Sequence, residues 1–148
     1  MTKPAAMRLR ILVADDLQDN ADSLAVLLRE HGHEVRTVHN GGDAVVAAAA
    51  MRPHVALLDI AMPGLDGYEV CRCIRAQNWG RKMFIVAQTA WGREMDLDRA
   101  RAAGFDMHMQ KPVNTQALLT HLEKFRRSES GNKSGGGTSP AALPDQGQ

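Results

Sequence analysis

Short apolar runs alternate with longer stretches of helical periodicity along most of the chain. Residues 55–58 include no polar side chain, which is typical of a strand buried on both faces of a parallel sheet. Four further runs, at about residues 9–14, 34–39, 83–88 and 105–110, also predict strands. Between and after these runs, apolar residues recur at the spacing of a helix. The pattern therefore predicts strands and helices in strict alternation.

Capping residues and breakers set the expected bounds of the helices. Asp19 or Asn20 can cap the first helix and Asp66 the third, whereas Gly32, Pro53 and Gly104 each end one. The five predicted helices cover about residues 20–31, 43–51, 66–77, 93–103 and 114–127. Alternation of this kind predicts an α/β fold, in which helices cover both faces of a parallel sheet.

The chain is expected to hold one folded domain. With 148 residues, of which 44% are hydrophobic, it can bury one substantial core but not two. From Ser128 the composition shifts to serine, glycine and proline with little apolar surface. Such a segment cannot offset the entropy lost on ordering, so we predict a domain over residues 7–127 and a flexible tail over residues 128–148.

Charge and hydropathy exclude several classes of protein. There are 18 basic and 17 acidic residues, a formal net charge of +1, which is unlike the basic surface of a nucleic-acid binder. No apolar run is long enough to span a membrane, and the N-terminus has no signal-peptide core. We expect a cytoplasmic protein that binds neither nucleic acid directly nor a membrane.

Residues of a few reactive types stand where four of the predicted strands end. Asp15 and Asp16 follow the first strand, Asp59 the third, Thr89 the fourth and Lys111 the fifth. In a parallel sheet with right-handed crossovers these strand ends share one edge, where open α/β folds place their active sites. For Asp59 alone, a helix cap or a solvated loop acid is an equally good interpretation. The coincidence of all four strand ends favours a functional site.

The chemistry of this set points to phosphoryl transfer. Three clustered carboxylates repel one another, and Mg²⁺ relieves that repulsion with the oxygen ligands it prefers. No thiolate or histidine pair accompanies them, which disfavours zinc. Lys111 adds a compact positive charge and Thr89 a hydroxyl donor. Asp59, central in the set, is the expected nucleophile. Because Gly41-Gly42 lacks the spacing and lysine of a phosphate-binding loop, a nucleotide is not the expected donor.

Over about residues 7 to 127, the chain resembles the receiver domains of two-component response regulators. The resemblance implies a flavodoxin-like, doubly wound, five-stranded parallel sheet in the order 2-1-3-4-5 with five helices. Residues 104–106 and 111–113 are similar to receivers attached to hybrid histidine kinases, so a stand-alone regulator and a fragment of a hybrid kinase both stay open. The resemblance rests on a set of short motifs in order, namely Asp15-Asp16, Asp59, Met62-Pro63-Gly64, Asp66-Gly67, Thr89-Ala90 and Lys111-Pro112.

The resemblance also implies a metal and a phosphoacceptor. In receiver domains the aspartate that matches Asp59 accepts a phosphoryl group from a histidine, so the same role is implied for Asp59. The matching positions for Mg²⁺ are Asp15, acting directly or through water, Asp16, Asp59 and the backbone carbonyl of Ala61. The implied partners are a histidine kinase or histidine phosphotransfer protein and a downstream protein target, with the chain a monomer or weak dimer.

Four further positions carry implied roles. Lys111 pairs with the phosphoryl oxygens, and its peptide bond to Pro112 is expected to be cis. Thr89 is the expected switch residue. His108 stands where many members have tyrosine or phenylalanine, and it is interpreted equally well as a rotating, pH-sensitive switch or as a half-exposed strand histidine without that role. Trp91 is expected to affect access to Asp59.

Two other functions compete with signalling. The first is an Mg²⁺-dependent phosphatase that works through an aspartyl-phosphate, although such enzymes typically carry a second aspartate two residues after the nucleophile, where this chain has Ala61. The second is a receiver-like fold kept only as a protein-interaction module. A signalling phosphoacceptor, which is not an enzyme beyond its own phosphorylation and dephosphorylation, fits the complete acid set best.

Overall fold

The computed structural model, which describes residues 8–90 and 95–131, contains one parallel sheet in the order β2-β1-β3-β4-β5. Its registers pair β1 with β2 and β3, and β4 with β3 and β5. The predicted fold class is confirmed. The strands are β1 (Arg10–Ala14), β2 (Glu34–Val38), β3 (Val55–Asp59), β4 (Phe84–Thr89) and β5 (Met107–Gln110).

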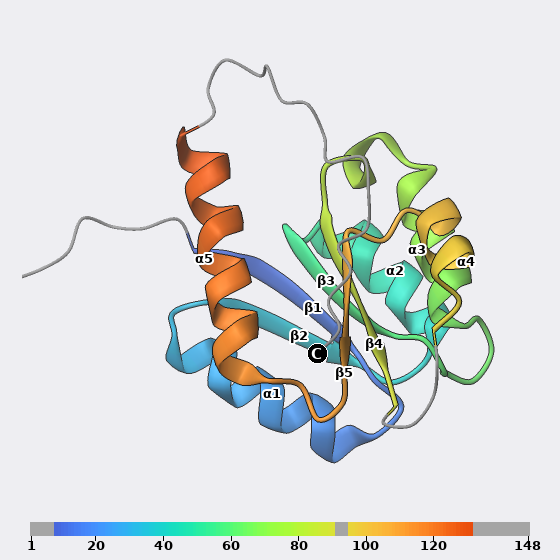
Figure 1. Cartoon of the computed structure of the whole chain (residues 1–148), viewed down its shortest axis with the longest axis horizontal. Helices are drawn as coiled ribbons and strands as arrows, with labels where there is room; N and C mark the ends of the chain where they lie inside the picture. The colour runs from blue at the N-terminus through green and yellow to red at the C-terminus, as the bar shows by residue number, and fades with distance from the viewer. Residues whose placement is uncertain (1–7, 91–94, 132–148) are drawn as a thin grey trace, which may run out of the picture.

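Helices cover both faces of the sheet (Figure 1). On one face lie α1 (Gln18–Glu30) and α5 (Thr115–Gly131). On the other lie α2 (Gly41–Met51), α3 (Gly67–Arg75), which leads into the 3₁₀ turn η1 (Asn78–Gly80), and α4 (Leu97–Ala103). This two-sided cover explains why β3 is buried along its whole length.

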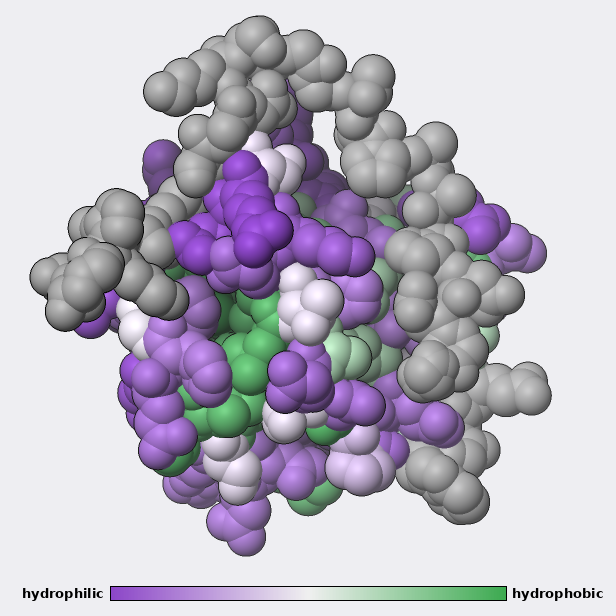
Figure 2. All heavy atoms as spheres, turned by 60° about the vertical axis from the view of Figure 1, so that its left-hand side comes forward, coloured by the Kyte–Doolittle hydropathy of each residue, from purple (hydrophilic) through white to green (hydrophobic). Residues whose placement is uncertain are grey.

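The surface is mostly hydrophilic on the face that Figure 2 turns forward, where polar residues surround a smaller central area of hydrophobic ones. Among the described residues, no helix combines the length and the apolar character that a membrane crossing requires.

Three helices begin at other residues than predicted. For α2, the helix begins at Gly41 rather than at residue 43, because Asn40 caps it by accepting the backbone N–H of Asp43. For α1, neither Asp19 nor Asn20 is the cap: the helix begins at Gln18, after an approach in which the Asp15 carboxylate accepts the backbone N–H of Leu17 at 2.9 Å. Leu17 is the N-cap residue, and no side chain caps the first turn of α1. For α4, the helix begins only at Leu97, because the side chain of Asp96 accepts the backbone N–H of Arg99 and so caps it there. Arg93, the predicted start, lies outside the described residues.

The last helix is longer than predicted. It continues through Gly131, so that residues 128–131, which the sequence predicts to be part of the tail, are helical. The polar composition that suggests a tail does not by itself prevent a helix that has already begun from adding another turn. Residues 132–148 lie outside the described residues.

Arg75 ties together three segments on the α2–α4 face. Its guanidinium donates hydrogen bonds to the backbone carbonyls of Gly80 and Met83, just before β4, at 2.8 and 2.7 Å. It also donates to the carbonyl of Gly104, which ends α4, and to the carboxylate of Asp106 at 2.9 Å. The C-terminal ends of α3 and α4 and the start of β4 are therefore fixed to one another by a single side chain.

His54 links β1 and β3 at the end of the sheet where the strands begin, opposite to the end that carries the acids. Its Nδ1 accepts the backbone N–H of Arg10 at 2.9 Å, which an imidazole can do only while that nitrogen carries no proton. Burial, and next the charge of Arg10, lower the pKa of His54. The folded state therefore favours the neutral ring. The contribution of His54 to stability is complete above the unfolded pKa of about 6.5 and is lost as the pH falls through the lower pKa of the folded state.

We predict that His54→Gln flattens the decline in stability between about pH 7 and pH 5, because the glutamine oxygen remains an acceptor at both. Urea unfolding at several pH values measures this slope. His31→Gln, at an exposed histidine, is the control for removing any imidazole. Equal slopes for wild type and His54→Gln would contradict the assignment.

Candidate functional site

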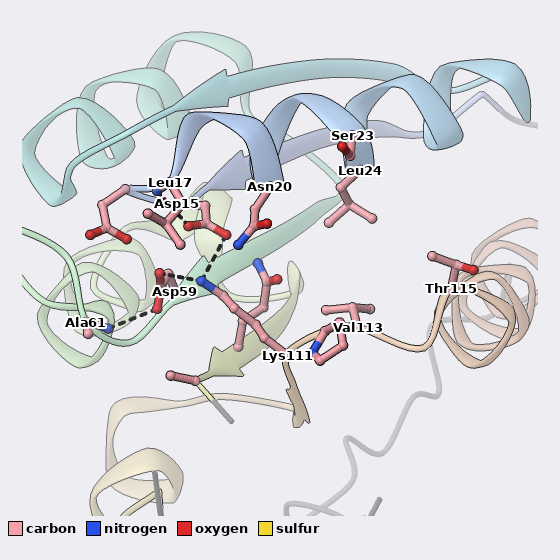
Figure 3. A pocket seen from close by; sticks show the side chains of 14 residues that line it. Asp15, Leu17, Asn20, Ser23, Leu24, Asp59, Ala61, Lys111, Val113 and Thr115 are labelled. Atoms are coloured by element: carbon pink, nitrogen blue, oxygen red, sulfur yellow. Dashed lines mark hydrogen bonds and ion pairs between the residues drawn. The ribbon is translucent and has the colours of Figure 1, made fainter. Parts of the chain in front are cut away.

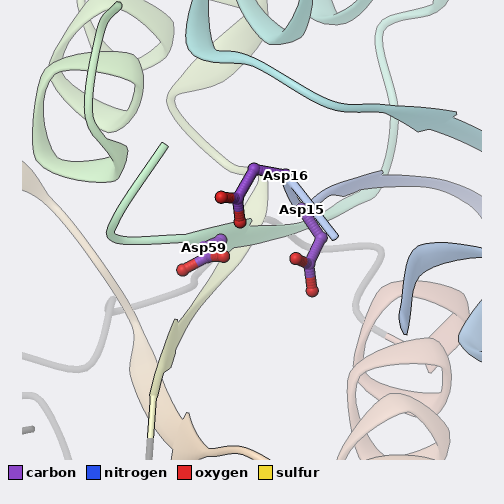
Figure 4. Close-up of side chains that lie close together, drawn as sticks. All are labelled: Asp15, Asp16 and Asp59. Atoms are coloured by element: carbon purple, nitrogen blue, oxygen red, sulfur yellow. The ribbon is translucent and has the colours of Figure 1, made fainter. Parts of the chain in front are cut away.

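Three carboxylates meet where β1 and β3 end (Figure 4). Because Ala14 pairs with Leu58, the next residues along the two strands, Asp15 and Asp59, emerge side by side. Both are buried, at 2% and 3% exposure, whereas Asp16 is exposed. One carboxylate oxygen from each of Asp15, Asp16 and Asp59 lies within 4.8 Å of the other two. Oxygen donors at this spacing, with one acid open to water, are the kind of ligand set that Mg²⁺ takes.

Lys111 reaches into this cluster from the end of β5 (Figure 3). Its Nζ lies 2.7 Å from Oδ2 of Asp59 and 3.0 Å from Oδ2 of Asp15. The backbone N–H of Lys111 donates to the carbonyl of Thr89 at 2.7 Å, which joins the ends of β4 and β5. The peptide bond between Lys111 and Pro112 is cis. The ammonium is thus an internal counter-charge for the two buried acids.

The charges of the site modify one another. Burial raises the pKa of Asp59 to about 6, although the hydrogen bond and the charge of Lys111 act in the opposite direction. For Lys111, burial acts against the charged form, but hydrogen bonds to Asp59 and Asp15 outweigh it and raise its pKa. At neutral pH the carboxylate of Asp59 is therefore ionised beside a charged ammonium, and an ionised carboxylate is a nucleophile without any general base.

The loop after β3 closes tightly around Asp59. The backbone N–H of Ala61 donates to Oδ1 of Asp59 at 3.1 Å, and that of Gly67 to the carbonyl of Ile60 at 2.9 Å. A Cβ on Gly67 would lie 2.6 Å from the carbonyl oxygen of Asp59, so only glycine fits. Asp66 caps α3 as predicted, in a capping box with Glu69.

We predict that Gly67→Ala destabilises the fold by about 1–3 kcal/mol, because backbone on both sides must move to admit the methyl group. The matched control is Gly42→Ala in α2, where a Cβ would meet only the Asn40 side chain, at 3.5 Å. That change should be neutral or stabilising by up to about 1 kcal/mol. Urea unfolding compares the two, and equal stabilities would contradict the steric argument.

The structure does not bring the two expected switch residues into the acid cluster. Thr89 is buried at the end of β4, yet it is not among the residues that line the cavity beside Asp59. His108 is half-buried on β5, paired with Ala87, and its Nδ1 has no hydrogen-bond partner among the described residues. Trp91 lies outside the described residues.

A cavity of about 660 Å³ extends from the acids between α1 and the segment that joins β5 to α5 (Figure 3). Ala61 and Pro112 line it, as expected of site residues. Two amide side chains in its wall, Asn20 and Gln88, are not predicted as site residues from the sequence. For Gln88 a signal exists: it is a polar residue at the end of an otherwise apolar strand.

Comparisons with known proteins agree with this geometry. The model of the response regulator receiver domain matches residues 11–123. Protein PilH of Pseudomonas aeruginosa is 34% identical over 110 residues, which cover 74% of this chain and 91% of PilH. The DNA-binding response regulator MtrA of Mycolicibacterium smegmatis is 34% identical over 124 residues, which cover 83% of this chain. The match spans only 53% of the length of MtrA.

Two solved structures share the fold over nearly their whole length. The receiver domain of sensor histidine kinase PA1611 from Pseudomonas aeruginosa, described with a magnesium ion coordinated in its active-site cleft, is 32% identical with a TM-score of 0.73, covering 81% of this chain and 98% of that domain. A putative response regulator from Chloroflexus aurantiacus is 27% identical with a TM-score of 0.74, over 81% of this chain and 98% of its own. Family model, relatives and site geometry agree, and the chain belongs to the response regulator receiver domains of two-component signalling.

Proposed function

We propose that this chain accepts a phosphoryl group from a histidine of a partner protein onto Asp59, in the presence of Mg²⁺. The observation that carries the proposal is the convergence of Asp15, Asp16 and Lys111 on the Asp59 carboxylate at the mouth of one cavity. Receiver domains are signalling modules rather than classical enzymes, so the expected result is one stoichiometric event and not continuous turnover.

The proposed roles follow from the donor set. Asp15, Asp16 and Asp59, with the backbone carbonyl of Ala61, would hold Mg²⁺, which supplies positive charge to the oxygens of the phosphoryl group in transfer. An oxygen of the Asp59 carboxylate forms the new bond to phosphorus while the bond from phosphorus to the histidine nitrogen breaks. Lys111 then exchanges one of its carboxylate partners for a phosphoryl oxygen.

The switch is proposed to act through β4 and β5. Thr89 would turn its hydroxyl toward the phosphoryl group, and His108, on the neighbouring strand, would occupy the space that opens. The phosphoryl group shifts the balance between two conformations only as far as it binds one of them better.

The partners proposed are a histidine kinase or histidine phosphotransfer protein and a downstream protein target. Support comes from the relatives, because PA1611 is a sensor histidine kinase and PilH and MtrA match over the same domain. We further propose residues 7–127 as the signalling unit and the segment that follows α5 as a linker or tail.

Incubation with Mg²⁺ and acetyl phosphate, followed by intact mass measurement, tests this function. We expect one phosphoryl adduct per chain, and none when EDTA removes the metal. Absence of an adduct with Mg²⁺ present would overturn the proposal. Repeated turnover of a phosphomonoester would instead favour the phosphatase alternative.

A further inference from the structure

The side-chain amide of Gln88 holds a buried donor that has no partner among the residues the structure describes. It is 3% exposed, and its Nε2 is one of only two buried side-chain polar atoms without a hydrogen-bond partner in the described part of the chain. It follows Ile85, Val86 and Ala87 in β4, so that an aliphatic residue here would continue the apolar run of the strand. A buried amide that lacks a partner destabilises the fold. Its presence at this place therefore indicates a ligand.

The register directs this amide toward Asp59. Gln88 pairs with Asp59 across β3 and β4, so that the two side chains emerge on the same face of the sheet from strands about 4.8 Å apart. Gln88, Asp59 and Lys111 all line the same cavity. The carboxamide thus stands beside the acceptor carboxylate, on the side opposite to Asp15, which neighbours Asp59 on β1.

Side-chain length sets the depth that the carboxamide reaches. Glutamine has one methylene more than aspartate, so its terminal group extends roughly 1.5 Å beyond that of its neighbour. A phosphorus atom bonded to the Asp59 carboxylate would stand at about this level. The last torsion of a glutamine side chain is broad, so the Nε2 donor can turn toward the new group.

We propose that the Gln88 carboxamide donates a hydrogen bond to a nonbridging oxygen of the phosphoryl group on Asp59. As the oxygen–phosphorus bond forms, the phosphorus–nitrogen bond of the donor histidine breaks and its electron pair leaves with the imidazole. Gln88 then shares the nonbridging oxygens with Mg²⁺, Lys111 and the Thr89 hydroxyl proposed above. The amide is neutral, so no proton changes place. The inference rests on the proposed function.

The variant Gln88→Met keeps an unbranched side chain of similar length and removes both hydrogen-bonding groups. We expect it to bind the phosphoryl analogue BeF₃⁻, with Mg²⁺ present, about tenfold more weakly than wild type, as for a lost hydrogen bond to a charged group. Affinity for Mg²⁺ alone and the melting temperature should not fall. If Gln88 had only a structural role, its replacement by methionine would lower the melting temperature. Gln110→Met, at an exposed glutamine on β5 outside the cavity, is the matched control.

A spectroscopic signal tests the contact directly. The side-chain amide pair of Gln88, assigned in ¹⁵N spectra by its loss in Gln88→Met, should shift when BeF₃⁻ is added to the Mg²⁺-loaded wild type. An unshifted amide, or a Gln88→Met chain that binds BeF₃⁻ as wild type does, would overturn the inference. Failure of wild type itself to bind BeF₃⁻ or accept a phosphoryl group would instead overturn the proposed function.

Discussion

A chain with Asp59→Asn takes up no detectable phosphoryl group from acetyl phosphate and Mg²⁺. The amide that replaces the carboxylate is not a nucleophile, and one of three charges that attract the metal is gone. The variant should still fold. Because burial raises the pKa of Asp59, the folded state disfavours the charged carboxylate, and the neutral asparagine should leave the free energy of unfolding equal or higher by about 1 kcal/mol. Intact mass and urea unfolding measure the two effects separately.

The matched control for this result lies in the same loop. Asp66→Asn also removes one carboxylate, but asparagine caps a helix as well as aspartate does. Its ion pair with Arg99 is partly exposed and contributes little. Asp66→Asn should therefore be phosphorylated as wild type is. An adduct that persists in Asp59→Asn would place the acceptor elsewhere.

Lys111→Met destabilises the chain by about 2–4 kcal/mol when no divalent ion is present. The change leaves Asp15 and Asp59, both buried, without their counter-charge. Added Mg²⁺ should restore more stability to this variant than to wild type, because the metal no longer competes with an ammonium for the same oxygens. Phosphorylation by acetyl phosphate should fall at least about tenfold, since a charged contact to the phosphoryl group is lost.

Urea unfolding with and without Mg²⁺ measures the coupling between Lys111 and the metal. Lys82→Met, at an exposed lysine before β4, is the control for removing a positive charge. The interpretation of Lys111 as an internal counter-charge fails if Mg²⁺ stabilises the Lys111→Met chain no more than wild type.

The acids and the lysine of this site could be predicted because each stands where a strand ends, a position that sequence patterns of a parallel sheet identify well. A carboxylate after the apolar run 55–58, or a lysine before a proline, marks the point where buried backbone meets solvent. Topology then brings Asp15, Asp59 and Lys111 together without any information on local geometry.

Helix starts were less predictable, because they depend on contacts between distant residues. The sequence suggests Asp19 or Asn20 as the cap of α1, but the helix has no side-chain cap, and the Asp15 carboxylate fixes the chain before it by accepting the backbone N–H of Leu17. Gln88 was overlooked for a related reason. The hydrophobic pattern identifies residues 83–88 as an apolar strand and does not distinguish one amide within it. The role of that amide depends on Asp59, its partner in the neighbouring strand.

The bonds of Arg75 constrain how α4 can move. Its guanidinium holds Gly104 at the C-terminal end of that helix, and Gly104 itself adopts a left-handed conformation with φ of 104°. The other end of α4 is held by the ring of Tyr68, whose hydroxyl accepts the backbone N–H of Asp96 at 3.1 Å and whose face lies under the Arg99 guanidinium. Both ends of α4 are therefore tied to α3, through Arg75 at one end and Tyr68 at the other. A displacement of α4 requires that one of these two sets of contacts break, or that α3 move with it.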